Sequence, residues 1–315
     1  TGSSGQLGEY ISNFFLNLGC KVYGLDKVKK KSFYSKNFFF KKVDISNEKQ
    51  ISEVLKYIKT KEKKIDIIIN GAAYNPVTHF SKRNKKELTL TSNTNIIGTI
   101  NLIKAFYKIQ KNNCKIINIG SVYGVRSPDF KIYGKKDRIS SEIYGGSKAA
   151  IIQITKYFAV FLSKYNVSVN CISPGGILNT VKQNKIFIKK YSNKVPIKRM
   201  GKPEDLSMAL LYFSSELTNY TTGQNLVIDG GFTICWLKKN LMLDKFKNFL
   251  NSDLRWKLIK LTKFTKINFY PNYHHKKGLR SFYTRLIANL IFREKMKKIK
   301  KNIFKEIFKD QKKYE

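Results

Sequence analysis

The stretch Thr1-Gly-Ser-Ser-Gly-Gln-Leu-Gly8 decides the fold, because it is a glycine-rich turn that leads directly into a segment of helical periodicity. Glycines are needed where a backbone turns tightly, approaches a pyrophosphate closely and packs a helix against a strand. The N-terminus of that helix offers unpaired N–H groups and a positive dipole end to phosphate. We therefore expect a dinucleotide site made by Gly2, Ser4, Gly5, Leu7 and Gly8; an ordinary glycine-rich turn is the alternative.

Beyond this loop, short apolar runs alternate with segments of 3.6-residue periodicity. We expect strands at 21–26, 65–70, 115–120, 167–173 and 225–228, and helices at 6–19, 48–60, 90–112, 143–164 and 203–216. Runs such as Ile65-Asp-Ile-Ile-Ile69 suit strands that are covered on both faces. The alternation predicts an α/β fold with a Rossmann-like, doubly wound parallel sheet.

The strand that should precede the glycine loop is not in the sequence. In a doubly wound sheet this strand is central, so its loss removes ladder hydrogen bonds on both sides and exposes two edges. We expect the native protein to be longer, and a chain that starts at Thr1 to be poorly stable.

The net charge of +40 at pH 7 is spread over the chain, since residues 234–315 carry +17 and the others carry +23. A uniform excess of Lys indicates compositional drift rather than a nucleic-acid site. No apolar run approaches the roughly 20 residues that span a bilayer, and the sequence shows no secretory signal. The four cysteines have no paired spacing and suit a reducing compartment. We expect a cytoplasmic protein.

The strand–helix alternation stops near Gly231, which divides the chain into a dinucleotide-binding domain, 1–233, and a basic extension, 234–315. Apolar residues near the end of the extension recur at helical spacing among Lys and Arg, so we expect helix there. The simplest interpretation is an appendage packed on the domain or on a neighbouring subunit. Contact with the inner face of an anionic membrane is an alternative, and single-stranded nucleic acid is a less favoured one.

Acidic and small residues follow the expected strands at places suited to a cofactor. Asp26 closes a strand about 20 residues after the loop, where a carboxylate accepts hydrogen bonds from the adenine-ribose hydroxyls and repels a 2′-phosphate. This favours NAD over NADP, although Lys27 follows directly and could soften the preference. Asp44 stands where it would meet the adenine ring. Asn70-Gly71-Ala72 would bring small residues beside the cofactor.

Tyr144-Gly-Gly-Ser-Lys148 is the most informative pentapeptide. Residues four apart share a helix face, and an ammonium beside a phenol stabilises the phenolate. Such a Tyr can exchange a proton with a hydroxyl or a carbonyl. Taken alone, the pair could also be two surface residues, since the chain is rich in Tyr and Lys.

With its motifs in this order, the stretch 1–233 resembles the short-chain dehydrogenase/reductase family. The matching elements are the glycine loop, Asp26, Asp44, Asn70–Ala73, Asn95-Ile-Ile-Gly98, Ile119-Gly-Ser121, Tyr144 with Lys148, Ser173-Pro-Gly-Gly176 and Thr222–Gly231. The resemblance implies an NAD(P)-dependent oxidoreductase that transfers a hydride between its cofactor and a hydroxyl or ketone of a small molecule.

The resemblance also implies the roles of single residues. Tyr144 would be the general acid and base, Lys148 would assist it and bind the nicotinamide ribose, and Ser121 would hydrogen-bond the reacting oxygen. Asn95 would hold a water that joins Lys148 to solvent. The nicotinamide side of the site would be lined by Pro174, Gly175 and Gly176. A homodimer or homotetramer through helices 90–112 and 143–164 is implied as well. No residues have metal-ligand spacing, so we expect no metal.

The spacing of the motifs bears on the substrate. Ser121 and Tyr144 lie further apart than in compact family members, and this spacing and the glycine pattern resemble the branch that modifies sugar nucleotides. Met200-Gly-Lys-Pro-Glu-Asp205 and Thr222–Gly231 resemble the compact branch. This combination of motifs from both branches resembles that of oxidoreductases in surface-polysaccharide and flagellin-glycan pathways. We therefore expect a sugar or sugar nucleotide as substrate.

The inserted stretch 125–142 would overhang the active site, and its basic residues would suit a phosphate or an acidic sugar. These residues are Arg126, Lys131, Lys135, Lys136 and Arg138. Two alternatives to a dehydrogenase remain open. One is an epimerase or dehydratase that retains its NAD, and the other is an inactive fragment or a member used only for binding.

Overall fold

The computed structural model describes residues 1–29, 35–76, 78–134 and 139–235. Lys135, Lys136 and Arg138 of the inserted stretch lie outside these ranges, and so does the expected helical extension apart from Ile234 and Cys235. Among the described residues, no helix has the length and apolarity that a membrane crossing requires.

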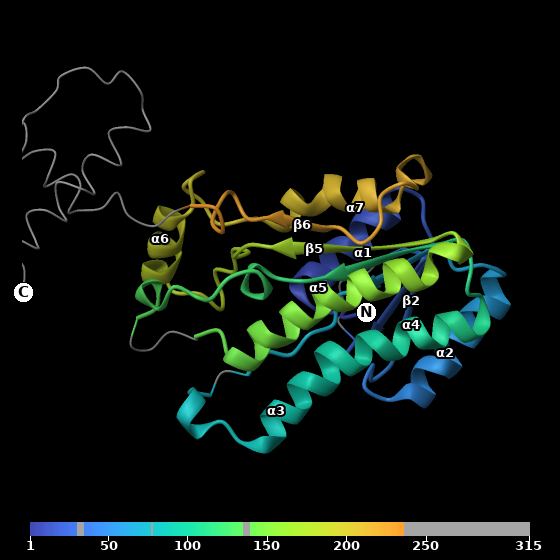
Figure 1. Cartoon of the computed structure of the whole chain (residues 1–315), viewed down its shortest axis with the longest axis horizontal. Helices are drawn as coiled ribbons and strands as arrows, with labels where there is room; N and C mark the ends of the chain where they lie inside the picture. Colours follow the sequence, from blue (N-terminus) through green and yellow to red (C-terminus); the bar gives the residue numbers. More distant parts are fainter. Residues whose placement is uncertain (30–34, 77, 135–138, 236–315) are drawn as a thin grey trace, which may run out of the picture. The chain divides into compact units, whose positions relative to one another are not determined.

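Within the described ranges, six parallel strands form the framework, in two groups (Figure 1). β1 (Val22–Asp26) pairs with β2 (Phe38–Lys42). A second sheet has the order β3-β4-β5-β6, with β3 at Ile67–Asn70, β4 at Cys114–Ile119, β5 at Val167–Pro174 and β6 at Asn225–Ile228. Every strand expected from the sequence is confirmed within two residues at each end, and β2 is an addition.

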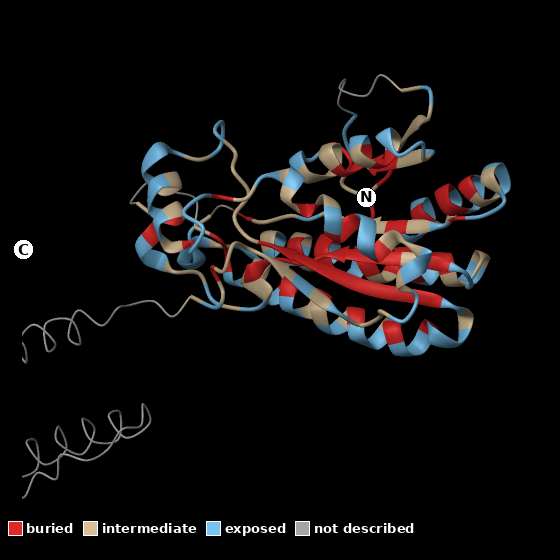
Figure 2. Cartoon of the chain, turned by 90° about the horizontal axis from the view of Figure 1, so that it is seen from above, coloured by how far each residue is buried: buried red, intermediate tan, exposed pale blue. Residues whose placement is uncertain are grey.

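Helices cover both faces of the strands, as the apolar runs predict. On one face, α1 (Gln6–Asn17) and α7 (Ser207–Ser214) bury Phe15 and Leu210 against Ile117 and Ile172. On the other, α2 (Glu48–Glu62), α4 (Gly98–Ile109) and α5 (Glu142–Leu162) form a second core. β5 is buried at all eight positions and β4 at all but one, and Figure 2 shows a buried strand at the centre of the sheet while the helices keep an exposed side. This is the doubly wound α/β architecture.

Two helical segments differ from the expectation. The predicted helix 90–112 is α3 (Lys85–Ser92), a π-helical turn at Asn93–Ile97 and then α4. A π-turn inserts a residue into the helical repeat, and here it places Asn95 in the interior at 2% exposure. The helix α6 (Lys185–Lys194) was not expected. It packs on a third, smaller core instead of the sheet, through Tyr191.

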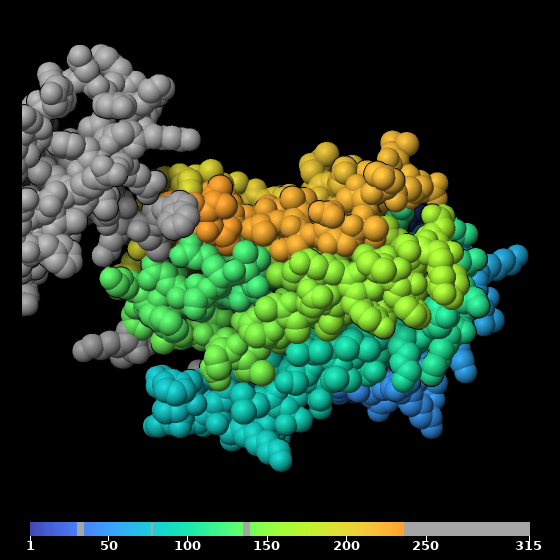
Figure 3. Space-filling view, in the orientation of Figure 1, coloured from blue at the N-terminus to red at the C-terminus, as the bar shows by residue number. Residues whose placement is uncertain are grey.

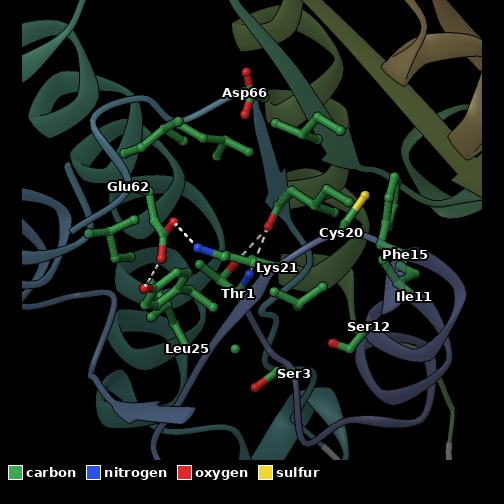
Figure 4. Close-up of a pocket in the computed structure, with 18 of the residues that line it drawn as sticks. Thr1, Ser3, Ile11, Ser12, Phe15, Cys20, Lys21, Leu25, Glu62 and Asp66 are labelled. Carbon is green, nitrogen blue, oxygen red and sulfur yellow. Dashed lines mark hydrogen bonds and ion pairs between the residues drawn. The ribbon is translucent and has the colours of Figure 1, made fainter. Parts of the chain in front are cut away.

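The two groups of strands lie on either side of a largely apolar cavity of about 400 Å³ (Figure 4). Residues 22–25 of β1 and 67–69 of β3 line it, together with Ile11 and Phe15 of α1. Lys21 and Glu62 form an ion pair of 2.7 Å in its wall. Among the described residues, no strand pairs with both β1 and β3.

A matched pair of substitutions on α7 tests the position of the core. Leu210 is 0% exposed and Met208 is 73% exposed. Leu210→Ala should lower the free energy of unfolding by about 2–5 kcal/mol because it leaves a cavity, whereas Met208→Ala should change it by less than about 0.5 kcal/mol. Urea denaturation measures both values, and equal losses would contradict this placement of α7.

Candidate active site

The glycine loop holds the N-terminus of α1 close to β1. Gly2 has a φ of +72° and donates its N–H to the Leu25 carbonyl oxygen at 2.8 Å. A Cβ on Gly8 would lie 2.0 Å from the Gly2 oxygen, so only glycine fits there. Gly5 caps α1 and has no side chain to bind the N–H groups of the first turn. Those groups remain available to a phosphate, as a helix N-terminus allows.

The segment after β3 is fastened to the start of the loop. The Thr1 hydroxyl accepts hydrogen bonds from the N–H groups of Gly71 (3.1 Å) and Ala72 (3.2 Å). The Asn70 side chain is buried and donates to the Asn118 Oδ1 at 2.7 Å, and Asn118 in turn donates to the Thr155 hydroxyl of α5 at 2.9 Å. The Asn70 amide thus ties β3 to β4, which leaves cofactor contacts in this segment to the backbone.

The two predicted acidic residues lie at the carboxyl ends of β1 and β2. Asp26 accepts hydrogen bonds from the N–H groups of Ser4 (3.0 Å) and Val28 (3.2 Å), and so links β1 to the glycine loop. Asp44 pairs with Lys27 at 2.9 Å. Burial opposes ionisation of Asp44, but the hydrogen bonds from Lys27 and Ser46 outweigh it and lower the pKa of Asp44 below its usual value. The charge of Lys27 is therefore partly balanced.

Tyr144 and Lys148 lie in the first turns of α5, on one face of the helix. The helix begins there because the Ser141 hydroxyl accepts the Tyr144 N–H at 3.1 Å. The Lys148 amine lies 5.7 Å from the centre of the Tyr144 ring. It is buried and donates to the Ile119 carbonyl oxygen, at the end of β4, at 2.6 Å. Burial lowers the pKa of Lys148 to about 8.

Ser121 follows β4 and begins a 3₁₀ turn at Val122–Gly124. Its hydroxyl oxygen accepts the Tyr123 N–H at 3.1 Å, which leaves the hydroxyl proton for another acceptor. Asn95 is engaged differently: its amide accepts the Tyr74 N–H at 2.7 Å and donates to the Tyr74 oxygen and to Ser147. It therefore fastens the segment after β3 to α5, and its water-holding role stays a prediction.

A cavity of about 1000 Å³ opens at the carboxyl ends of β4 and β5, and both Ser121 and Tyr144 line it. Gly175 and Gly176, which follow Pro174 at the end of β5, form the opposite part of the lining, and Gln6 extends it to the glycine loop. The predicted residues thus fall along one edge of the strands. The glycine loop, Asp26 and Asp44 lie at one end of this edge, while Ser121, Tyr144 and Lys148 lie at the other.

The basic residues of the inserted stretch do not behave as expected. Arg126 donates to the Phe232 carbonyl oxygen at 2.7 Å, and its guanidinium lies 5.1 Å from the Phe232 ring. Neither Arg126 nor Lys131 lines the cavity. Among the described residues, the one charged side chain in the lining is Lys182, from the segment before α6. Phe232 engages the Arg126 guanidinium, and a phosphate contact through the inserted stretch stays a prediction.

Sequence reasoning missed several residues of the site. Ser147 lies inside the pentapeptide and donates to the Tyr144 carbonyl oxygen at 2.8 Å, so its proximity to Tyr144 was a usable signal. Lys182 precedes α6 and Tyr191 lies within it, and neither residue belongs to a recognisable sequence motif. The described residues contain no group of three His, Cys, Asp or Glu side chains arranged to hold a metal.

A parallel sheet with a glycine loop and a Tyr–Lys pair at its carboxyl edge defines a class of protein, the nicotinamide-dependent oxidoreductases. Residues 25–233 match a family model described as enoyl-(acyl carrier protein) reductase. The chain is 31% identical over 240 residues to the 3-oxoacyl-[acyl-carrier-protein] reductase FabG of Buchnera aphidicola subsp. Schizaphis graminum, covering 73% of this chain and 94% of that protein.

Solved structures agree with this comparison. A short chain dehydrogenase from Leptospira borgpetersenii, crystallised with bound NAD+, is 38% identical with a TM-score of 0.69, covering 74% of this chain and 90% of that one. ElxO with NADP bound shares the fold at 24% identity and a TM-score of 0.65, covering 73% of this chain and 95% of that one. The chain belongs to the short-chain dehydrogenase/reductase family.

The buried Lys148 amine gives a pH-dependent stability. In the folded protein its pKa is about 8, against 10.5 in an exposed lysine. Between these pH values the unfolded chain binds the additional proton, so folding stability rises with pH. Relative to Lys148→Met, the wild type should gain free energy of unfolding from pH 8 to about pH 10.5 in urea titrations. Lys156→Met, an exposed site on α5, is the control; a constant difference between wild type and Lys148→Met would contradict the burial.

Proposed function

We propose that this chain transfers a hydride between a nicotinamide cofactor and a ketone or secondary alcohol, with Tyr144 as the general acid and base. The observation that carries the proposal is that Ser121 and Tyr144 line one cavity at the carboxyl ends of the strands, with the Lys148 amine next to Tyr144. The glycine loop fits a dinucleotide, because Gly5 leaves the first-turn N–H groups of α1 without a side-chain partner.

The chain's own residues supply substrate placement and proton transfer. Ser121 is oriented by the Tyr123 N–H and can donate its proton to a substrate oxygen. Tyr144 gives a proton to that oxygen in reduction and takes it back in oxidation. Lys148 is held by the Ile119 oxygen, and its positive charge favours the phenolate. When bound, the nicotinamide supplies or accepts the hydride, with the adenine end at Asp26 and Asp44 and the nicotinamide end at Pro174, Gly175 and Gly176.

NAD is the cofactor we propose, rather than NADP. The Asp26 carboxylate stands at the end of β1 beside the glycine loop, where it would repel a 2′-phosphate. The Asp44 carboxylate pairs with Lys27, the one nearby cation that the sequence suggested as a partner for that phosphate. The bound NAD+ of the Leptospira relative supports the same choice.

A sugar or sugar nucleotide is the substrate class that we propose. The cavity lining combines amide side chains, from Asn75, Asn179 and Gln183, with the positive charge of Lys182, and the described part of the chain places no carboxylate in it. This suits a hydroxyl-rich molecule with a phosphate group. The Buchnera relative is named for reduction of 3-oxoacyl groups on acyl carrier protein, so 3-oxoacyl thioesters are the competing class.

A homodimer or homotetramer is consistent with the outer side of α5. Tyr157, Val160 and Phe161 form an exposed apolar strip there, on the face of the molecule that α4 and α5 cover in Figure 3. Exposed apolar patches of this kind are typical of contacts between subunits.

Replacement of the Tyr144 hydroxyl tests the chemistry. Tyr144→Phe should lower turnover roughly 10²- to 10⁴-fold while NADH affinity, measured by fluorescence titration, stays nearly unchanged. Tyr57→Phe, on α2 away from the cavity, is the matched control. Unchanged turnover of Tyr144→Phe would refute the mechanism. Turnover without net oxidation or reduction of free cofactor would point to an epimerase or dehydratase instead.

The charge of the cavity tests the substrate class. In a panel of nucleotide sugars, unphosphorylated sugars and 3-oxoacyl thioesters, we expect turnover of a nucleotide sugar. Lys182→Gln should raise KM for that substrate about fivefold with little change in kcat, as loss of a partly exposed ion pair predicts. Lys185→Gln, outside the cavity lining, is the control. Turnover of the thioesters alone would contradict the sugar proposal.

A further inference from the structure

Backbone hydrogen bonds hold much of the loop that carries Gly175 and Gly176, and the side chains of Gln6 and Gln183 bind the carbonyl oxygens that follow. Gly175 donates to the Ile228 oxygen at 2.8 Å, the Gly176 oxygen accepts the Gly201 N–H at 2.9 Å, and Leu178 donates back to Gly201 at 2.8 Å. The Gly176 N–H has a side-chain partner on α6. It donates to the hydroxyl of Tyr191, a residue of α6, at 2.6 Å.

Tyr191 is fitted closely to this glycine. A Cβ on Gly176 would lie 2.6 Å from the Tyr191 ring, so the ring packs directly on the backbone of the loop. Tyr191 is 2% exposed, and a buried phenol needs a hydrogen-bond partner. Burial raises the pKa of Tyr191 to about 12, so the hydroxyl stays protonated.

Two further residues hold Tyr191 in place. Its ring stacks on the Phe232 ring at 4.8 Å between centres and 13° between planes. Phe232 is 1% exposed and is itself held by Arg126, through the carbonyl oxygen at 2.7 Å and the ring at 5.1 Å. Asp229 fixes the same turn by accepting the N–H groups of Gly231 and Thr233. Three segments that are distant in sequence thus meet at the cavity wall, where Tyr191 itself is part of the lining.

We propose that Tyr191 is a positioning residue, whose hydroxyl holds the Gly175–Gly176 wall of the cavity and whose ring is held by Phe232 and Arg126. Arg126 of the inserted stretch then contributes to the reaction although it does not line the cavity. The inference rests on the proposed function, because it places the nicotinamide beside this wall. Small displacements of a reacting group reduce turnover strongly, so the hydroxyl affects kcat more than affinity.

Tyr191→Phe tests the proposal, because it removes the hydroxyl and leaves the stacked ring. In the cofactor-free protein, hydrogen exchange of the Gly176 amide should accelerate about tenfold while the amides of β5 keep their rates, as loss of a single hydrogen bond predicts. With cofactor and substrate, kcat should fall about tenfold and the NADH dissociation constant should stay within about twofold.

Tyr107→Phe is the matched control, since it removes a hydroxyl that meets Tyr165 and does not line the cavity. It should leave both Gly176 exchange and kcat unchanged. An unchanged exchange rate at Gly176 in Tyr191→Phe would overturn the proposal, and so would a changed exchange rate with an unchanged kcat. Faster exchange throughout β5 would show a general loss of stability and would also overturn it. Failure of the proposed function appears separately, as full turnover by Tyr144→Phe.

Discussion

The interaction on which the site depends is the hydrogen bond from the buried Lys148 amine to the Ile119 carbonyl oxygen, 2.6 Å long. It fastens the first turns of α5 to the end of β4, and burial of the amine costs free energy unless such a partner is present. The turn after Ser121 packs closely against the backbone of α5 at Lys148. A Cβ on Gly124 would lie 2.6 Å from the Lys148 carbonyl carbon, so the turn after Ser121 can pack against the helix only with glycine there. The bond therefore sets the relation between the two residues that line the cavity, Ser121 on the turn and Tyr144 on the helix.

The carboxyl ends of the strands carry two groups of residues with different proposed roles. The end near β1 and β2 carries the glycine loop and two carboxylates that are already engaged with backbone N–H groups and Lys27. The end near β4 and β5 carries the proton-transfer residues and the wall formed by Gly175 and Gly176. A third core, which contains Tyr191 and Phe232, supports that wall, and Tyr191 is also part of the cavity lining. The three parts are separate in sequence, and the parallel sheet brings them to one edge.

Much of this arrangement could be predicted from local sequence. The strands follow from apolar runs, which depend on neighbouring residues. Tyr144 and Lys148 share a helix face by their spacing, but they were singled out by the order of the family's motifs along the chain. The roles of Arg126 and Tyr191 could not be predicted, since each depends on a partner more than ten residues away: Phe232 for Arg126, and Gly176 for Tyr191. Asn95 was found from its motif, but the π-turn that buries it has no signal in the periodicity. Charge counting grouped Arg126 with the other basic residues of the inserted stretch, and its packing against Phe232 could not be foreseen.

The most direct measurement is a crystal structure of the protein soaked with NADH. The account predicts the pyrophosphate at the N-terminus of α1, the adenine end beside Asp26, and the nicotinamide between Tyr144 and the Gly175–Gly176 wall. A dinucleotide bound elsewhere, or a nicotinamide ring remote from the Tyr144 hydroxyl, would contradict it.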